Sequence, residues 1–205
     1  MKNSLAEQYD SLYKAKDNVY GGPVPAVVKL PEYLSKGTVL DIGGGEGRNT
    51  LYLARQGYEV TITDLSKAGL SKVEAESETE SLSVKIKVSD VVTDGIEDDF
   101  DAIVCTFVFH HLNTENAVRV IKEIQDHTTN GGINIITTFT NKGGLYDRNQ
   151  KSGSGRYYPS ADEIGRLYSG WKILFLKTRE TTTHAKDKDG NRMQNQMMIL
   201  IAQKS

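Results

Sequence analysis

A glycine-rich stretch decides the fold of this chain: Thr38-Val39-Leu40-Asp41-Ile42-Gly43-Gly44-Gly45-Glu46-Gly47-Arg48-Asn49-Thr50. An apolar run enters a cluster of glycines, and a helical pattern of apolar residues follows from Leu51. The pattern predicts a strand, a tight loop and a helix. Glycines let such a loop turn with positive φ and let a ligand approach the backbone closely. The first turn of the helix then directs free N–H groups and the positive end of its dipole at that ligand.

The spacing of the glycines narrows the choice of ligand. The dinucleotide fingerprint Gly-x-Gly-x-x-Gly needs a third glycine, and Arg48 stands at that position when the count starts at Gly43. Thr50 stands there when the count starts at Gly45. A phosphate-binding loop is also disfavoured, because the two acidic residues of the stretch would repel phosphate.

The loop instead resembles the first motif of the class I S-adenosylmethionine (SAM) methyltransferases, through the pattern Asp41-x-Gly43-x-Gly45-x-Gly47. The resemblance implies a Rossmann-like α/β fold with a seven-stranded, mostly parallel sheet in the order 3-2-1-4-5-7-6, an antiparallel strand 7 and helices on both faces. It implies SAM as the cofactor and S-adenosylhomocysteine as its product. Gly43, Gly44 and Gly45 would pack against the methionine part of SAM, and Asp41 would help to hold its ammonium group. The alternative, a turn without a ligand, would cost conformational entropy with no compensating contact.

The composition is that of one globular domain. The 205 residues suit a single methyltransferase domain at 1–205, with a helical lid at 1–36 and a polar loop over the active site at 141–160. The net charge of −2 indicates no nucleic-acid partner. No apolar run approaches the roughly 20 residues of a membrane span, and residues 1–10 lack the apolar block of a signal peptide.

The single cysteine, Cys105, excludes an internal disulfide. It lies in the apolar run 102–108, which favours a buried packing thiol over a nucleophile. A chain without disulfides suits a reducing compartment, so we expect a cytoplasmic protein. We also expect a monomer or homodimer that acts on a small molecule.

Periodicity predicts alternating helices and strands. Helices are expected at 4–17, 25–34, 48–56, 67–78, 114–127 and 160–168, and strands at 38–42, 59–63, 83–88, 101–106, 133–138, 171–177 and 197–203. The alternation of Val84, Ile86 and Val88 indicates an edge strand. Residues 141–159 predict a long polar loop, which is either a lid over the pocket or a plain surface excursion.

Acidic residues follow the second and third predicted strands. Asp64 lies close to the ~20 residues after Gly43 at which such folds place an acid for the ribose hydroxyls; a helix cap is the alternative. Similar enzymes place an acid, here Asp90, near the adenine amino group, with an apolar neighbour, here Val91, against the ring; a loop cap is the alternative. The resemblance assigns further cofactor contacts to Arg48, Asn49, Leu65 and Thr106.

Two adjacent histidines, His110 and His111, follow the fourth predicted strand. Because the family has the wall beside the reacting methyl group there, we expect His111 to line the active site; a hydrogen-bonded loop histidine is the alternative. Adjacent side chains tend to diverge, and no Asp, Glu or Cys cluster is spaced to complete a metal site, so we expect no metal. Near the N-terminus, Tyr9 and Tyr13 either pack their helix onto the sheet or form a lid over the cofactor.

The C-terminal part indicates a narrower family. Gly45–Ala54, Glu163–Trp171 and His184–Arg192 resemble blocks of the tellurite-resistance methyltransferases, and the last block is the most specific. The hairpin that carries His184 and Arg192 should project from the ligand edge of the sheet, because its first strand follows a crossover helix.

That resemblance implies roles for two residues of the hairpin. Arg192 would hold the oxygens of an acceptor, and His184 would orient the acceptor or remove its proton. The expected function is direct in-line transfer of a methyl group from SAM to a small acceptor such as tellurite or selenite. The family tends to carry arginine where Ala185 stands, which keeps a thiol or another small metabolite as an alternative acceptor. A SAM-binding module without turnover is the alternative from another class of function.

Overall fold

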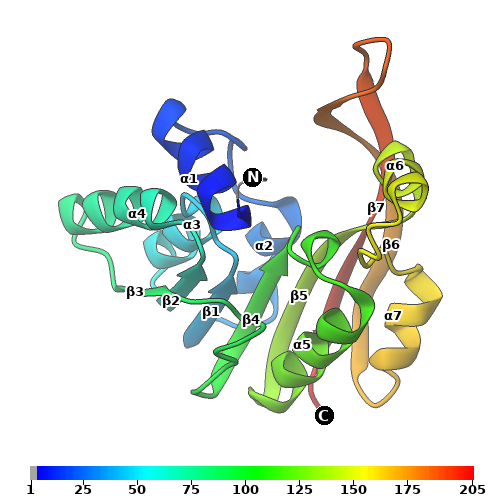
Figure 1. The fold of residues 1–205 in the computed structure, drawn as a ribbon. Coiled ribbons are helices and arrows are strands. Elements are labelled where there is room, and N and C mark those ends of the chain that lie inside the picture. Colours follow the sequence, from blue (N-terminus) through cyan, green and yellow to red (C-terminus); the bar gives the residue numbers. More distant parts are fainter. Residues whose placement is uncertain (1–3) are drawn as a thin grey trace.

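One mixed sheet forms the centre of the molecule. The computed structural model describes residues 4–205, apart from the side chain of His184. The strands are β1 Thr38–Ile42, β2 Glu59–Asp64, β3 Val84–Val88, β4 Phe100–Thr106, β5 Thr128–Gly143, β6 Lys172–Lys186 and β7 Arg192–Gln203. They are ordered β3-β2-β1-β4-β5-β7-β6 (Figure 1). Neighbours from β3 to β5 are parallel, and β7 runs antiparallel to both β5 and β6. The expected topology is confirmed, including β3 at one edge.

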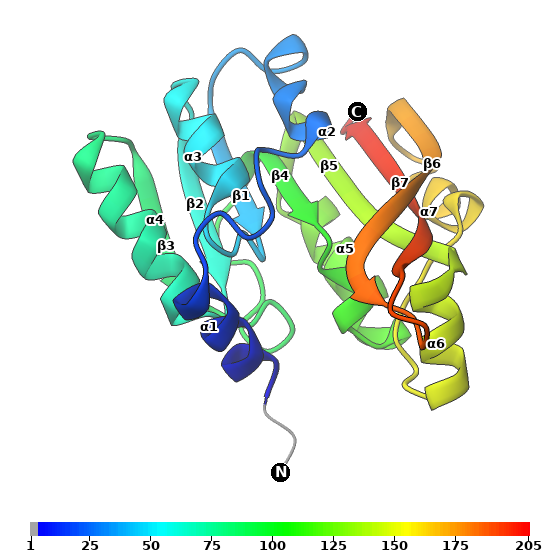
Figure 2. The same ribbon diagram turned by 90° about the horizontal axis from the view of Figure 1, so that it is seen from above.

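Helices cover both faces of the sheet (Figure 2). The α-helices are α1 Leu5–Ala15, α2 Pro25–Val28, α3 Arg48–Arg55, α4 Lys67–Thr79, α5 Thr114–Asp126, α6 Gly144–Ser152 and α7 Ala161–Leu167; the 3₁₀ helices are η1 Leu30–Glu32 and η2 Phe109–His111. Apolar residues of α2 and α3 pack with Val39 and Val104, and those of α5 and α7 pack with Leu40 and Cys105. Successive strand residues point to opposite faces, which separates these two cores. Cys105 is 1% exposed, so the predicted packing thiol is confirmed, and burial raises the pKa of its sulfur group.

The strand register gathers the predicted site residues at one edge of the sheet. Ile42 at the end of β1 is paired with Thr63 of β2 and Cys105 of β4. The next residues along these three strands are Gly43, Asp64 and Thr106. In open α/β sheets, ligands bind outside the carboxyl ends of the strands, which is where these three residues lie.

The expectation of a loop throughout 141–159 is wrong, because α6 occupies Gly144–Ser152. The helix ends at Gly153, which has a left-handed conformation with φ 63°. A contact from far along the chain holds its first turn: the Leu145 N–H donates to Asn195 Oδ1 at 2.8 Å. The sequence of this helix is largely polar and has no clear apolar periodicity, so the sequence alone does not predict the helix.

Three other elements differ in their bounds from the predictions. The strand expected at 133–138 is longer, since β5 covers Thr128–Gly143. The C-terminal hairpin is longer, since β6 continues to Lys186 and β7 begins at Arg192, and Figure 1 shows the hairpin projecting beyond the sheet. The helix expected at 25–34 is divided into α2 and η1. Pro31 explains the division, because proline lacks the N–H that would continue a helix and crowds the preceding turn.

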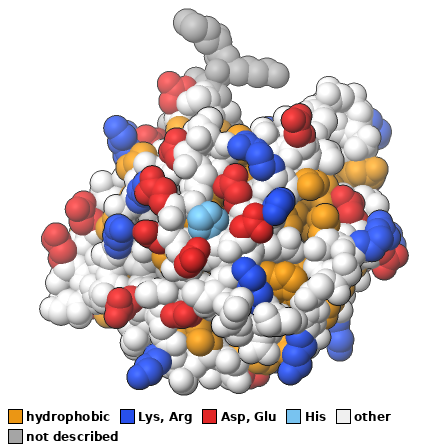
Figure 3. All heavy atoms as spheres, turned by 90° about the horizontal axis from the view of Figure 1, so that it is seen from below, with side chains coloured by type: hydrophobic (Ala, Val, Ile, Leu, Met, Phe, Trp, Pro, Cys, Tyr) orange, Lys and Arg blue, Asp and Glu red, His pale blue; other side chains and the backbone are white. Residues whose placement is uncertain are grey.

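The surface opposite the projecting hairpin carries both signs of charge. On the face seen in Figure 3, Lys and Arg side chains are interspersed with Asp and Glu. Among the helices of residues 4–205, none has the length and apolar character needed to cross a membrane.

Candidate active site

A cavity of about 570 Å³ opens at the carboxyl ends of β1, β2 and β4. Most of the predicted site residues line it: Gly43, Gly44, Arg48, Asn49, Asp64, Leu65, Asp90, Val91, Thr106 and His111. Asp41, Gly45 and Arg192 are not among its lining residues, and the side chain of His184 lies outside the described part of the structure. The strand ends, helix α1, helix η2 and the C-terminal hairpin each contribute one wall.

The glycine-rich loop forms the floor of the cavity. Gly43, Gly45 and Gly47 have φ values of 66°, 60° and 81°, which residues with a Cβ atom rarely adopt. The amides of Gly43 and Gly44 both donate to the carbonyl oxygen of Thr63, at 2.8 and 3.2 Å. This pairing fixes the loop against β2.

Asp64 has the geometry of a ligand-binding carboxylate. Its Oδ2 accepts from the Gly45 N–H at 2.9 Å, and its Oδ1 accepts from the Ser66 N–H at 2.7 Å. The helix-cap alternative is wrong, because Ser66 is the N-cap of α4 and accepts from the Gly69 N–H. Burial raises the pKa of Asp64, and these amides oppose that effect. The remaining lone pairs of a carboxylate in this position can accept from two neighbouring hydroxyls.

Asp90 lines the cavity and also caps its own loop. Its Oδ1 accepts from the Val92 N–H at 2.9 Å, which fits the loop-cap alternative. Asp90 and Val91 nevertheless both border the cavity, beside Ser89. The two interpretations are therefore compatible, because one carboxylate oxygen of Asp90 has no part in that turn.

Asp41 lies behind the loop. Its side chain is fully buried, and Oδ2 accepts from the Thr50 hydroxyl at 2.7 Å. Its Oδ1 is buried without a hydrogen-bond partner among the described residues. Burial raises the pKa of Asp41 from the usual 3.8 to about 6, against the opposing bond from Thr50. The structure thus shows a bond from Asp41 to helix α3, and the predicted contact with an ammonium group stays a prediction.

Replacing Asp41 with asparagine should change how stability depends on pH. Folded Asp41 binds its proton more tightly than the unfolded chain does, so the free energy of unfolding falls as the pH rises from about 4 to about 6. A pKa difference of this size corresponds to about 3 kcal/mol. His110 and His111 act in the opposite direction, because folding lowers their pKa values. The free energy of unfolding of Asp41→Asn, minus that of the wild type, should therefore increase by up to about 3 kcal/mol from pH 4 to pH 7.

Urea unfolding of the ligand-free protein across this pH range measures that gain. Asp98→Asn is a suitable control, because Asp98 is exposed and its Oδ2 lies 3.7 Å from Lys85 Nζ. If the difference in the free energy of unfolding between Asp41→Asn and the wild type did not change with pH, the raised pKa of Asp41 would be contradicted.

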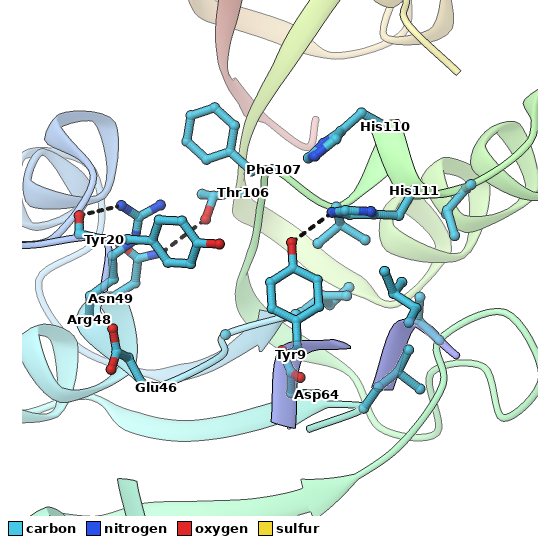
Figure 4. Close-up of a pocket in the computed structure, with 18 of the residues that line it drawn as sticks. Tyr9, Tyr20, Glu46, Arg48, Asn49, Asp64, Thr106, Phe107, His110 and His111 are labelled. Atoms are coloured by element: carbon cyan, nitrogen blue, oxygen red, sulfur yellow. Dashed lines mark hydrogen bonds between the residues drawn. The ribbon is translucent and has the colours of Figure 1, made fainter. Parts of the chain in front are cut away.

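The first residues of α3 attach the N-terminal segment to the cavity (Figure 4). Asn49 Oδ1 accepts from the Val24 N–H at 2.9 Å, while its Nδ2 donates to the Thr106 hydroxyl at 3.1 Å. Arg48 donates to the carbonyl oxygen of Tyr20 at 3.1 Å and lies over the rings of Tyr20 and Phe107. These bonds bring Tyr20 into the cavity wall.

Helix α1 closes the cavity from the opposite side. Tyr9 and Tyr13 both line it, and the Tyr9 hydroxyl lies 3.0 Å from His111 Nε2. Asp10 fixes the helix, since its Oδ1 accepts from the Ser66 hydroxyl at 2.6 Å and from the Ala68 N–H at 3.0 Å. The two tyrosines therefore form part of the wall over the glycine-rich loop.

The two histidines lie side by side, contrary to the expectation that they diverge. The ring centroids of His110 and His111 are 4.0 Å apart, because both belong to the tight turn η2. Burial lowers the pKa of His111 to about 4 and holds that of His110 well below its usual range. Both rings are therefore neutral at physiological pH. In the described part of the chain, no group of three or more His, Cys, Asp or Glu could hold a metal ion.

The C-terminal hairpin supplies the remaining wall through β6. Thr181–Thr183 and Ala185 line the cavity. Arg192, at the start of β7, is exposed and paired in register with Lys186. The hairpin thus reaches the ligand edge as its predicted direction requires, but Arg192 faces solvent in this structure.

Two lining residues, Tyr20 and Glu46, are not assigned to the site by the sequence, whereas Phe107 and His110 belong to the wall expected after β4. Glu46 accepts from the Val19 N–H, which holds the segment after α1 against the glycine-rich loop. The position of Glu46 inside the glycine-rich motif is the one signal in the sequence that could have identified it.

Comparisons with known proteins agree with this geometry. A family model described as "Tellurite resistance protein TehB" matches residues 7–201. A curated relative from Haemophilus influenzae (strain 10810), named "Probable S-adenosyl-L-methionine-dependent methyltransferase TehB", is 30% identical over 178 residues, which cover 87% of this chain and 61% of the relative. The chain thus matches less than two thirds of the length of that relative.

Two solved structures share the fold of this chain. The crystal structure of TehB from Haemophilus influenzae has a TM-score of 0.79 at 27% identity and covers 96% of this chain and 67% of that chain. The N-methyltransferase NodS from Bradyrhizobium japonicum WM9, in complex with S-adenosyl-L-homocysteine, has a TM-score of 0.71 at 13% identity over 98% of this chain and 99% of its own, which shows the shared fold alone. The family match covers nearly all of the described residues. The chain therefore belongs to the tellurite resistance protein TehB family.

Proposed function

We propose that this chain is a SAM-dependent methyltransferase that acts on a small acceptor. The observation that carries the proposal is Asp64, which is fixed by the amides of Gly45 and Ser66 at the edge of a cavity floored by the glycine-rich loop. This arrangement suits a nucleoside, because a carboxylate held by two amides can accept from both ribose hydroxyls. The names of the relatives support the same function.

The lining residues fit the parts of SAM. Asp64 would hold the ribose, Asp90 and Val91 would hold the adenine, and the glycines of the loop would pack against the methionine part. When bound, SAM supplies an electrophilic methyl group on its sulfonium. Tyr9 and Phe107 border the same cavity from opposite walls (Figure 4). With SAM bound, these walls would orient the reactants and limit the access of water, which is most of what direct methyl transfer requires.

His111 is one of the polar groups on the wall formed by η2. Its Nε2 is engaged by the Tyr9 hydroxyl, and its low pKa keeps it neutral. It would therefore shape the site and hold Tyr9, rather than carry a positive charge. The catalytic roles of His184 and Arg192 stay proposals drawn from the resemblance.

An oxyanion acceptor, tellurite or selenite, is a second candidate. It is suggested by the family description, and Lys186 and Arg192 place two cations in register on the hairpin. If an oxyanion uses them, Arg192→Ala should lower turnover at least tenfold with tellurite and leave SAM affinity within about twofold. Equal loss of both quantities would remove that role from Arg192.

The test of the proposed function is formation of S-adenosylhomocysteine from SAM, with tellurite, selenite, a small thiol and a catechol offered separately. Isothermal titration calorimetry gives SAM affinity independently of the acceptor. We expect SAM to bind and at least one acceptor to raise product formation above the blank. Binding without turnover on any acceptor would favour a SAM-binding module, and failure to bind SAM would overturn the proposal.

A further inference from the structure

Arg156 lies at the rim of the cavity, beside the wall formed by η2. It forms an isolated antiparallel bridge with Asn113, and the N–H of the next residue, Tyr157, donates to the carbonyl oxygen of Leu112 at 2.8 Å. Leu112 itself lines the cavity. These backbone contacts fix residue 156 next to the end of η2, although its side chain is exposed and is not part of the lining.

The two residues after Arg156 anchor this segment in the core. Tyr157 is buried, and its hydroxyl donates to Glu163 Oε1 at 2.7 Å. Tyr158 is also buried, with its ring centroid 6.3 Å from that of His110. Because the backbone at this point is held by buried side chains, less conformational freedom is lost when the arginine binds a ligand.

The charge of Arg156 acts on groups at the junction of two walls of the cavity. Burial lowers the pKa values of His110 and His111 on η2, and the nearby guanidinium lowers both further. Burial raises the pKa of Tyr9 on α1, and the same guanidinium opposes that effect. Since the Tyr9 hydroxyl lies 3.0 Å from His111 Nε2, a cation that acts on both groups lies close to the point where α1 and η2 meet.

In the cavity lining that the structure describes, carboxylates outnumber cations. Glu46, Asp64 and Asp90 line it, whereas the guanidinium of Arg48 already donates to a backbone carbonyl and lies over two rings. An anionic acceptor would be attracted by the sulfonium of bound SAM, and the carboxylates would oppose its approach. A cation at the rim offsets that repulsion and raises the rate of encounter.

The guanidinium of Arg156 is available for such a contact. Within residues 4–205, leaving aside the side chain of His184, it forms no ion pair with an acidic side chain. Its planar N–H groups can donate in parallel to two oxygens of one ligand, which suits an oxyanion or a carboxylate. The position and the free donors together indicate a binding group for anionic oxygens.

We infer that Arg156 binds the anionic oxygens of the acceptor and thereby selects which acceptors reach the methyl group. The inference rests on the proposed function and names a residue that determines its substrate class. The acceptor is then a small molecule that reacts through one atom and carries charged oxygens beside it. An oxyanion and a carboxylate both provide such oxygens, and the experiment distinguishes these two sources.

Three acceptors test the inference: tellurite, mercaptoacetate and 2-mercaptoethanol. The two thiols react through the same kind of atom, but only mercaptoacetate carries a carboxylate. Arg156→Gln should raise KM for tellurite and mercaptoacetate about fivefold to tenfold and leave kcat within about twofold, because the contact is the same in the ground state and the transition state. KM for 2-mercaptoethanol should stay within about twofold.

Two further variants separate a binding role from a structural one. Arg156→Lys keeps the positive charge and should recover part of the loss with the anionic acceptors. Arg166→Gln is the matched control, because it removes an exposed arginine from α7 and should leave all three KM values within about twofold. Calorimetric titration should give SAM affinities within about twofold of the wild type for every variant.

Turnover of tellurite alone would identify the oxyanion as the source of the oxygens, and turnover of mercaptoacetate alone would identify the carboxylate, provided that Arg156→Gln raises the KM concerned. An equal rise of KM for all three acceptors, or no rise for any, would overturn the inference. Turnover confined to 2-mercaptoethanol would overturn it too, as would SAM binding without turnover of any acceptor. Failure to bind SAM would instead remove the proposed function itself, so calorimetry distinguishes the two failures.

Discussion

Replacing Asp64 with alanine should weaken SAM binding about 100-fold. Its two oxygens accept from the Gly45 and Ser66 amides at 2.9 and 2.7 Å, which fixes the carboxylate at the edge of the cavity. Hydrogen bonds from ribose hydroxyls to a charged acceptor contribute about 1.5–3 kcal/mol each. Loss of about 3 kcal/mol corresponds to roughly 100-fold in affinity.

Two further variants separate charge from hydrogen bonding at Asp64. Asp64→Asn keeps one acceptor oxygen and loses the charge, so its affinity should fall about tenfold. Asp98→Ala removes an exposed carboxylate away from the cavity and should leave affinity within about twofold. Calorimetric titration with SAM and with S-adenosylhomocysteine measures all three variants. Wild-type affinity in a folded Asp64→Ala variant would show that Asp64 has no part in binding the nucleoside.

Local periodicity was enough to predict the central part of the fold. The strand predicted at 38–42 has the observed bounds of β1, and α3 begins at Arg48 as predicted. Glycines with positive φ and buried alternating residues carry strong local signals of this kind. The strand order, in contrast, came from the resemblance to a family, because pairing between distant strands leaves no local pattern.

The elements that were missed depend on distant partners. Helix α6 is held through Asn195, fifty positions after Leu145. The outer parts of β6 and β7 consist mainly of polar residues, so their sequence lacks the alternation of apolar and polar residues that marks a half-buried strand. Their pairing with each other, up to Lys186 and Arg192, is what extends them.

The candidate site divides in the same way. Asp64 was predicted from its spacing after Gly43 and Thr106 from the resemblance, and both lie at the edge where the carboxyl ends of parallel strands meet. The segment 19–24, which contains Tyr20, is held at this edge by single hydrogen bonds to Glu46, Arg48 and Asn49. No sequence pattern predicts such isolated long-range bonds. For Asp41 a signal existed: alternation places it on the same face as buried Val39, toward the helix that contains Thr50.

Gly69 connects the glycine-rich loop with helix α4, and its replacement should destabilise the protein. A Cβ at Gly69 would lie 2.8 Å from the carbonyl oxygen of Gly45. Because that neighbour is backbone and not the end of a flexible side chain, helix and loop must separate. Overpacking of this kind costs about 1–3 kcal/mol, so Gly69→Ala should lower the free energy of unfolding by about 2 kcal/mol. SAM affinity should fall as well, since the displaced segment contains an amide that holds Asp64.

Gly165→Ala is the matched control for this prediction. Gly165 is also helical, in α7, but a Cβ there would lie 3.5 Å from Leu176 Cδ2, which is an ordinary contact. Alanine is the better helix former, so this variant should keep or gain stability, by up to about 1 kcal/mol, with unchanged SAM affinity. Urea unfolding without ligand, followed by calorimetric titration with SAM, compares the two variants. Similar behaviour of both would mean that α4 can move away from the loop without loss, and the close backbone contact would then have no role in the site.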